Sequence, residues 1–307
     1  MTKTTSYEKN ISPRTAKLLN NDSIAKCTDC DVSSLAMNHV ESPDVSQSGT
    51  SEPTLCRFCN GTTRPHWRRG LFNRCLSCGL LMRNRAAEGA ELDRLYRQSW
   101  LDPDFRRSET GGTELAHSRV YAAKLARALH IKDFTGLRIC DFGAGRGSMS
   151  QALSELGAEI YAVEPFGYDF LIKQGIRAFR NLRDLPPGVE LDGVVSISVL
   201  EHLDTPWQAL RQIRERLKPS GWAYLATPNA NGLVARIAHD RWREAVRPGH
   251  LVLLTAKMMA KILEWAGYSS YRRLRWCVAY QSGARNLFGY ALQMSGLDGE
   301  LRYLAFK

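Results

Sequence analysis

Over residues 137–165 the apolar positions change period twice, and this pattern predicts a strand, a tight turn, a helix and a second strand. An apolar run at 137–140 is interrupted by three glycines at alternate positions of 143–147. Apolar residues then recur at helical spacing over 149–156, and a second apolar run at 160–163 resumes an extended segment. The stretch therefore predicts one half of an open α/β sheet of the nucleotide-binding type.

The same patterning continues to the end of the chain and adds further elements. Val194–Leu200 is an almost continuous apolar run, as expected of a parallel strand that is covered on both faces. Thr205, Pro206 and Gln208 have the order of a capping box with proline at the first helical position, so a helix is expected from there to Pro219–Gly221. We also expect helices over residues 113–130, 168–174, 255–265 and 282–294 and strands over residues 178–182, 270–278 and 301–306.

Residues 1–54 do not share this periodicity. They are rich in Ser, Thr, Asn and Asp and predict a disordered polar tail. The net charge of +11 lies elsewhere, because residues 1–55 carry 5 basic and 7 acidic side chains while residues 56–307 carry 37 and 24. This excess is spread without a dense run, so an ordinary solvated surface explains it better than an anionic partner.

Segments that would direct the chain to a membrane are not visible in the sequence. No basic stretch near the N-terminus joins an apolar core of the length found in secretory signals. No apolar stretch reaches the roughly 18 residues needed to span a bilayer. We therefore expect a cytoplasmic protein with no membrane span.

Two Cys-x-x-Cys pairs have 15 residues between them, which is the spacing of a four-cysteine zinc ribbon. Each pair can form a tight turn that directs two thiolates to one tetrahedral ion, and a glycine follows each pair closely. Two disulfides are the alternative, which a reducing compartment disfavours. We predict a structural Zn²⁺ bound by Cys56, Cys59, Cys75 and Cys78.

The other four cysteines have different surroundings. Cys27 and Cys30 form a third pair in the polar tail, and we interpret them as solvent-exposed thiols. Cys140 lies in an apolar strand and Cys277 lies beside Trp276, where a buried apolar thiol is expected.

The glycine turn can bind a ligand as well as reverse the chain. Glycines let the backbone approach a ligand, and the N-terminus of the following helix presents free N–H groups. Glu164 closes the second strand, 21 residues after Gly143, where a carboxylate can accept hydrogen bonds from both hydroxyls of a ribose. A dinucleotide fits less well, because the third glycine comes one residue early and Asp141 would repel a pyrophosphate. A generic turn without a ligand is the remaining alternative.

The sequence Asp141-Phe-Gly-Ala-Gly-Arg-Gly147 resembles the first motif of the class I S-adenosylmethionine-dependent methyltransferases, an acid, any residue, then Gly-x-Gly-x-Gly. The resemblance implies a Rossmann-like, seven-stranded, mostly parallel sheet whose seventh strand is antiparallel. It implies S-adenosyl-L-methionine (SAM) as cofactor, with Asp141 at the amino-acid end and residues 181 and 182 flanking the adenine. The expected cofactor-binding residues are Asp141, Gly143, Ala144, Gly145, Gly147, Glu164, Asn181, Leu182 and Leu200.

A second motif follows the apolar strand that ends near residue 200. Leu200-Glu-His-Leu203 and the later Leu217–Asn229 resemble the fourth and fifth strand motifs of small-molecule methyltransferases such as the ubiquinone-pathway enzymes. Some of those relatives place a further Glu three residues before the Glu-His pair and bind a metal there. This sequence has Ser198 at that position, so we predict no catalytic metal.

Three residues near this motif are candidates for catalysis. His202 stands at the carboxyl end of the strand, where open α/β sheets bind ligands, and an imidazole can accept a proton near neutral pH. His250 is its rival, because it lies where relatives build a substrate lid. For either histidine a structural hydrogen-bonding role is the alternative. Glu201 is expected to cap the following turn or to position the substrate.

The segment from Arg74 to Tyr96 resembles a bacterial methyltransferase group that carries a zinc ribbon ahead of the catalytic domain and is often associated with sugar modification. The usual Asn-Pro after the ribbon is Asn84-Arg85 here. The resemblance implies a small-molecule acceptor, with O- or C-methylation of a sugar or polysaccharide precursor as the first expectation. A phenolic, quinone or natural-product acceptor is the alternative, and so is a catalytically silent module that binds SAM or a partner.

A nucleic-acid acceptor is disfavoured. Amino-methylating enzymes of that type carry Asn/Asp-Pro-Pro-aromatic after the fourth strand, and here that place holds Leu200–Leu203. We expect three parts, a polar tail at 1–54, a zinc ribbon and linker helix at 55–110, and the methyltransferase domain at 111–307. The added helix over 282–294 is expected to shape the substrate pocket or to form the face of a homodimer.

Overall fold

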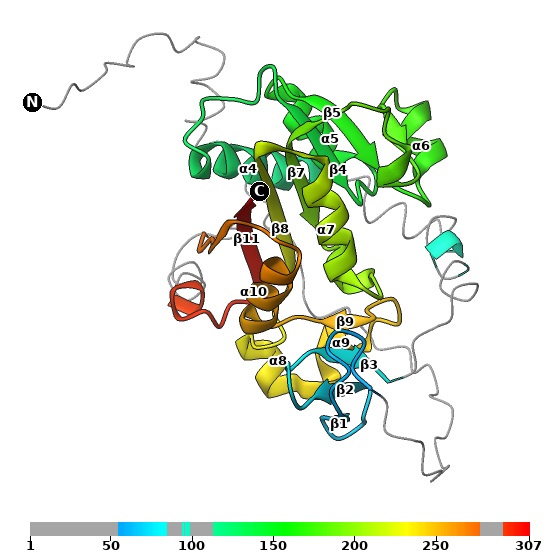
Figure 1. Ribbon diagram of the computed structural model, residues 1–307, viewed down its shortest axis with the longest axis vertical. Helices are drawn as coiled ribbons and strands as arrows, with labels where there is room; N and C mark the ends of the chain where they lie inside the picture. The colour runs from blue at the N-terminus through cyan, green and yellow to red at the C-terminus, as the bar shows by residue number, and fades with distance from the viewer. Residues whose placement is uncertain (1–54, 85–93, 95, 99–112, 277–290) are drawn as a thin grey trace, which may run out of the picture. The chain divides into compact units, whose positions relative to one another are not determined.

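The chain divides into two units between Ser51 and Glu52. The computed structural model describes residues 55–84, 94, 96–98, 113–276 and 291–307, all of them in the second unit (Figure 1). The expected polar tail, Cys27, Cys30, Cys277 and most of the helix expected over 282–294 lie outside the described residues. The division into three parts therefore stays a prediction.

Seven strands pair into the main sheet, and they are β4 (Arg138–Phe142), β5 (Glu159–Val163), β6 (Ala178–Phe179), β7 (Leu191–Ile197), β8 (Leu217–Pro228), β10 (Ser270–Arg273) and β11 (Glu300–Phe306). Their order is β10-β11-β8-β7-β4-β5-β6. All neighbours from β8 to β6 are parallel, whereas β11 is antiparallel to both β8 and β10. The expected mostly parallel sheet with an antiparallel last strand is confirmed.

Helices pack on both faces of this sheet. They include α4 (Thr113–Ala128) and α5 (Ser148–Glu155) on one face and α7 (Pro206–Arg216) and α10 (Ala256–Trp265) on the other. In β7, Val195 is buried in the same cluster as α4 and α5, and its neighbour Val194 is buried in the cluster of α7 and α10. Burial on both faces explains why this strand is continuously apolar. A further helix, α6 (Tyr168–Lys173), packs beside β6.

Several expected boundaries differ from those of the structure. The strand expected to reach Leu200 ends at Ile197, because Ser198 has a φ of 55° and leaves the extended conformation. Helix α7 ends at Arg216, and Leu217 already begins β8, so Pro219 lies in a strand. The strand expected over 178–182 stops at Phe179 and is followed by a 3₁₀ turn.

The expected capping box before α7 is wrong. Thr205 is the N-cap residue, and Pro206 is the first helical residue as expected. The Thr205 hydroxyl donates to Gln208 Oε1 at 3.1 Å and does not accept a hydrogen bond from a backbone N–H group. The Thr205 and Gln208 side chains therefore bond to each other and do not cap the backbone of the helix.

A second, four-stranded antiparallel sheet lies beside the turns of the two cysteine pairs and includes one strand from much later in the chain. Its strands, in spatial order, are β1 (Thr63–His66), β2 (Phe72–Cys75), β3 (Leu81–Arg83) and β9 (Val252–Leu253). Figure 1 shows β3 beside β9. Leu80 and Met82 are buried in one cluster with Leu254 and Met258. A sheet region of about 30 residues buries too little apolar surface to be stable alone. Here it shares a hydrophobic core with the rest of residues 52–307.

None of the described helices has the length and apolar composition of a membrane-spanning helix.

Candidate active site

The glycine turn joins β4 to α5 and has the backbone geometry that the sequence predicts. Gly143 has a φ of 79°, and a Cβ there would lie 2.2 Å from Val199 Cγ2. Gly147 has a φ of 83°, and a Cβ there would lie 2.5 Å from Ile176 Cδ1. A Cβ on Gly145, with a φ of 52°, would meet no described atom within 4 Å. Two of the glycines thus permit close packing, and Gly145 leaves open space beside the backbone where a ligand can approach.

Asp141 lies at the end of β4, 3 % exposed, and it lines a cavity. Its Oδ2 accepts a hydrogen bond of 2.7 Å from the Ser150 hydroxyl of α5. Burial raises the pKa of Asp141 to about 6, against the hydrogen bonds from Ser150. An ammonium group nearby would favour the charged carboxylate, which fits the predicted contact with the amino-acid end of SAM.

Glu164 follows β5, and backbone donors fix the orientation of its carboxylate. Oε2 accepts from the Gly145 N–H group at 3.0 Å, and Oε1 accepts from the N–H groups of Phe166 and Gly167 at 3.0 and 3.3 Å. Burial raises its pKa, whereas these hydrogen bonds oppose the shift. Each carboxylate oxygen can accept more than one hydrogen bond, so the predicted contact with a ribose stays compatible with this arrangement.

The remaining predicted cofactor residues have different outcomes. Ala144, Asn181 and Leu182 line the same cavity, with the Asn181 side chain donating to Asp184 Oδ2 at 3.1 Å. Gly147 turns the chain but does not line the cavity. Leu200 is fully buried in the core and also lies outside the cavity lining, so its position does not support the predicted contact with the cofactor. The turn at Ser198 redirects the chain and brings Val199 to the cavity in its place.

One cavity of about 1050 Å³ joins these residues to the two candidate histidines. Small-molecule sites typically measure about 300–1,000 Å³, so this cavity lies at the upper end of that range. We call the part lined by residues 141–146, 148 and 149 and by Glu164 the glycine half. The part lined by Tyr96, His202 and residues 247–250 is the histidine half.

His202 lies at the centre of the polar contacts in the histidine half. Its Nδ1 lies 2.6 Å from Tyr96 Oη and 3.0 Å from the carbonyl oxygen of Gly249. Tyr96 stacks on Phe166 with 4.9 Å between the ring centroids, so one aromatic pair contacts both halves of the cavity. Burial lowers the pKa of His202, which keeps the imidazole neutral near pH 7.

His250 is 1 % exposed and packs edge-on against His202, with 4.6 Å between the ring centroids. Its Nδ1 lies 3.7 Å from Glu244 Oε2. Burial, assisted by His202 and Arg247, lowers the pKa of His250 to about 3. An imidazole with so low a pKa is a weak proton acceptor near neutral pH, so the structure favours His202 over His250 as the base.

Glu201 is 1 % exposed and lies outside the cavity lining. Its Oε2 accepts a hydrogen bond of 2.9 Å from the Thr227 hydroxyl, and burial raises its pKa to about 8. None of its described hydrogen bonds caps the following turn, and its predicted role in positioning a substrate stays a prediction. Its backbone carbonyl accepts from the Leu251 N–H group at 2.7 Å and so holds the segment that carries His250.

Glu201, His202 and His250 each bring one oxygen or nitrogen atom to within 4.8 Å of the others. Such a group has the donor types that bind a divalent cation. The absence of a catalytic metal, inferred from Ser198, stays a prediction.

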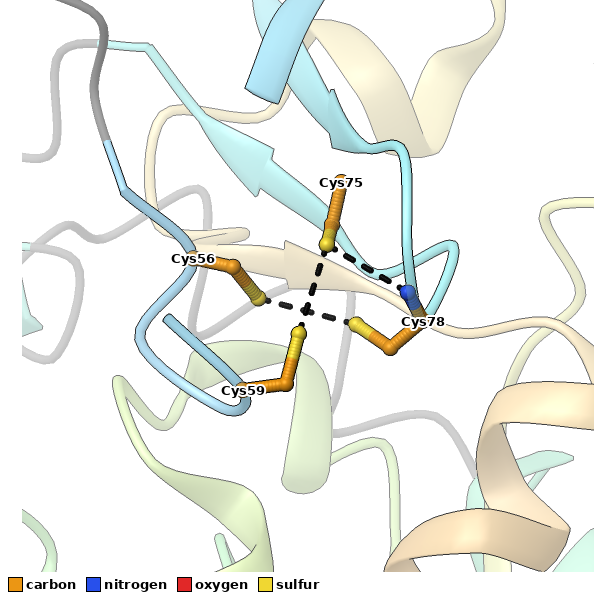
Figure 2. Close-up of side chains that lie close together, drawn as sticks. All are labelled: Cys56, Cys59, Cys75 and Cys78. Atoms are coloured by element: carbon orange, nitrogen blue, oxygen red, sulfur yellow. Dashed lines mark hydrogen bonds between the residues drawn. The ribbon is translucent and has the colours of Figure 1, made fainter. Parts of the chain in front are cut away.

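The four cysteines of the ribbon converge from two tight turns (Figure 2). The Sγ atoms of Cys56 and Cys78 lie 3.6 Å apart and those of Cys59 and Cys75 lie 3.5 Å apart. Four thiolates about 2.3 Å from one tetrahedral Zn²⁺ would lie roughly 3.8 Å apart, so the thiols fit the predicted ion. All four are free cysteines. The glycine after the first pair is also required, because a Cβ on Gly61 would lie 2.6 Å from Ser77 Oγ.

Two residues in or beside the histidine half, Tyr96 and Arg83, were not predicted from the sequence to belong to the site. Tyr96 ends the Leu-x-x-Leu-Tyr pattern after the ribbon, but its contact with His202 spans 106 residues. Arg83 donates three side-chain hydrogen bonds to the carbonyl oxygens of Ala245, Arg247 and His250. The resemblance to a ribbon-bearing group is the signal that could have directed attention to Tyr96. No sequence pattern pointed to Arg83.

Comparisons with known proteins agree with this site. Residues 114–271 match a family model described as a methyltransferase domain. Two curated relatives are a tRNA U34 carboxymethyltransferase of Chromohalobacter salexigens, 29% identical over 47% of this chain and 48% of its own length, and a ubiquinone biosynthesis O-methyltransferase of Cereibacter sphaeroides, 32% identical over 32% and 44%. The chain thus spans less than half the length of these relatives.

Among solved structures, a SAM-dependent methyltransferase of Thermotoga maritima, titled a possible histamine N-methyltransferase, matches 70% of this chain and 99% of its own with a TM-score of 0.50. Its sequence is 14% identical, so this likeness shows the fold alone. The family model covers just over half of the chain and includes the glycine turn, Glu164 and the Glu201-His202 motif. The resemblance inferred from these motifs is confirmed, and the chain belongs to the methyltransferase-domain family.

Proposed function

We propose that this protein transfers the methyl group of SAM to a hydroxyl group of a small acceptor. The observation that carries the proposal is the single cavity in which the acidic residues of the glycine half and the imidazole of His202 line one continuous space. Family membership supports SAM as the methyl donor. Oxygen as the acceptor atom is supported by the relative from Cereibacter sphaeroides, which is named an O-methyltransferase.

The glycine half has the groups that would hold SAM. Asp141 offers a carboxylate to a cation, Glu164 offers oriented oxygens to a diol, and Gly145 leaves the backbone accessible. Bound there, SAM would supply a strongly electrophilic methyl group. The residues of this half then need only to hold the donor in line with the acceptor.

The histidine half has the group that would accept the hydroxyl proton. The Gly249 carbonyl can only accept hydrogen bonds, so His202 Nδ1 at 3.0 Å carries the proton and donates to it. Nε2 is then the basic nitrogen of a neutral ring. Burial raises the pKa of Tyr96, which therefore stays protonated and donates to the same carbonyl at 3.2 Å. Together these bonds fix the tautomer that a general base requires.

A small hydroxylated aromatic compound fits this chemistry better than a sugar. A phenol has a pKa near 10, so a neutral imidazole can accept its proton while the phenol oxygen attacks the methyl group. A sugar hydroxyl is a far weaker acid, and its proton is harder to remove. The stacked pair Tyr96 and Phe166 also offers an aromatic wall to a flat acceptor. None of the relatives named above is described as acting on a sugar, so we do not retain the sugar expectation.

The test is incubation of the purified protein with methyl-labelled SAM and separate pools of phenols, sugars and tRNA. We expect label in the phenol pool, and we expect His202→Gln to reduce its rate about 100-fold or more, as loss of a general base does. The relative from Chromohalobacter salexigens is named for a tRNA, and label in the tRNA pool would replace our proposal. Calorimetric binding of SAM with no labelled product in any pool would favour a silent binding module.

A further inference from the structure

The zinc ribbon contacts segments that lie next to the histidine half in the chain, through several independent interactions. Strand β3 pairs with β9, which directly follows His250 and Leu251. Arg57 forms an ion pair with Asp204, which lines the cavity. Phe58 packs against Trp207 of α7 with 5.2 Å between the ring centroids. The ribbon is therefore packed against the part of the protein that surrounds His202.

Arg83 makes the most extensive of these contacts. Its Nε donates to the carbonyl oxygen of His250 at 2.7 Å, and its Nη2 donates to those of Ala245 and Arg247 at 2.9 and 2.5 Å. Its backbone N–H group donates to the Leu251 carbonyl oxygen at 2.9 Å. One arginine thus holds four carbonyl groups of residues 245–251. Hydrogen bonds from a guanidinium are charge-assisted and stronger than those between neutral groups.

Residues 245–251 connect Arg83 to the candidate base. Arg247 and His250, whose carbonyls Arg83 binds, flank the Gly249 carbonyl that accepts from His202 and Tyr96. A shift of this segment would move the Gly249 carbonyl oxygen, and His202 would then no longer be held in one tautomer. Arg83 itself does not line the cavity, so its effect on the site passes through the segment.

The cysteine site fixes the hairpin that carries Arg83. Cys75 ends β2, Cys78 lies in the turn, and β3 begins three residues later at Leu81. The Cys75 N–H group donates to the Leu80 carbonyl oxygen at 2.9 Å, so the metal-binding turn and the start of β3 are bonded together. Arg83 also lies over the buried ring of Phe72 in β2, at 4.7 Å from its centroid.

We propose that Arg83 is a positioning residue through which the zinc ribbon orders residues 245–251 and fixes the tautomer of His202, without acting on the glycine half. The proposal assigns the ribbon a role in the acceptor side of the reaction and none in SAM binding. It rests on the proposed function for the role of His202. The ordering of residues 245–251 does not depend on that function.

The test compares Arg83→Met with Arg74→Met. Methionine keeps the apolar packing on Phe72 and removes every guanidinium donor, while Arg74 lies on the neighbouring strand with an exposed side chain. In Arg83→Met we expect amide hydrogen exchange in peptides spanning residues 243–251 to become at least about tenfold faster, because charge-assisted bonds to that segment are lost. Zinc content and the calorimetric Kd for SAM are expected to change less than about twofold. Arg74→Met is expected to change none of the three quantities.

A spectroscopic measurement separates positioning from a general loss of stability. With ¹⁵N-labelled histidine, and His202→Gln to assign the signal, we expect the His202 imidazole to show one Nδ1–H tautomer in the unchanged protein and a mixture in Arg83→Met. Removal of zinc by a chelator is expected to speed amide hydrogen exchange in the same peptides of the unchanged protein. In Arg83→Met, removal of zinc is expected to cause no further increase in the exchange rate. If Arg83→Met does not fold, Arg83→Lys, which keeps the charge and loses the paired donors, takes its place.

Three results would overturn the proposal. They are unchanged exchange over residues 243–251 in the folded variant, an unchanged His202 tautomer, and a fall in SAM affinity that parallels the loss of protection. None of these measurements requires turnover. The labelled-SAM assay therefore tests the proposed function separately.

Discussion

The two halves of the cavity are built in different ways. The glycine half comes mostly from one continuous stretch, and the hydrogen bond from the Gly145 N–H group to Glu164 spans only 19 residues. The histidine half is assembled from distant segments, with contacts that span 106 residues between Tyr96 and His202 and 167 between Arg83 and His250. The first half is therefore stabilised locally, whereas the geometry of the second depends on the whole unit, including the ribbon.

The largest expected effect is the loss of the glycine half in Gly143→Ala. The left-handed φ costs about 1–2 kcal/mol for an L-residue, and the clash with Val199 adds roughly 1–3 kcal/mol. We expect SAM binding to become undetectable by calorimetry. Gly188→Ala is the matched control, because Gly188 has a φ of 77° and a Cβ there would meet no described atom within 4 Å. Retained SAM affinity in Gly143→Ala would contradict the close packing on which the turn depends.

Cys75→Ser is expected to lower zinc content and stability while leaving SAM binding nearly unchanged, the reverse of Gly143→Ala. Loss of the fourth thiolate should release zinc and lower the free energy of unfolding by about 2–4 kcal/mol, in the upper range for single substitutions. SAM affinity should change less than about fivefold, because no residue of the glycine half contacts the ribbon directly among the described interactions. Zinc assay, urea unfolding and calorimetry measure the three quantities. Ser77→Ala, in the same turn, should keep its zinc, and equal loss in both variants would exclude Cys75 as a ligand.

Glu164→Ala should weaken SAM binding about 100-fold, which corresponds to roughly 2.7 kcal/mol. The loss combines the predicted ribose contact with the three backbone N–H groups that Glu164 now orients. The control is Glu159→Ala, since Glu159 is a carboxylate at the exposed start of the same strand. A similar Kd for both variants would remove Glu164 from the site.

Measured per pH unit, the smallest expected effect is a pH dependence that originates at Glu201. Its pKa is raised to about 8 by burial, so the folded protein binds this proton more tightly than the unfolded chain does. Stability should therefore decline as pH rises from about 4.5 to 8, by at most about 1.4 kcal/mol per pH unit. Glu201→Gln keeps an acceptor for Thr227 and should flatten the decline in urea unfolding. Parallel curves for the two proteins would show that Glu201 does not titrate in this range.

The locality of the glycine half explains why the sequence predicted it well. Asp141, Gly143, Gly145 and Glu164 lie within one strand–turn–helix–strand unit, and their relative placement follows from the geometry of that unit. The four cysteines were equally predictable, because the ligand spacing of a ribbon is a local property.

The region around residue 198 was predicted less well. The apolar run suggested a strand up to residue 200, but the left-handed turn at Ser198 ends it at Ile197, and Leu200 and Glu201 are buried outside the cavity lining. A positive φ in a serine has no sequence signal as clear as that of a glycine. The contacts of Tyr96 and Arg83 depend on which distant segments pack together, and neither periodicity nor spacing contains that information.

Strand β9, which comes from the methyltransferase part of the chain and pairs with β3, has a consequence for the independence of the ribbon. A chain shortened to residues 111–307 would leave the edge of Val252–Leu253 without its partner and expose the apolar cluster that Leu80 and Met82 now cover. Unpaired strand edges beside apolar surface promote association between molecules. The shortened chain should therefore aggregate, and the ribbon cannot be exchanged or removed as a separate module.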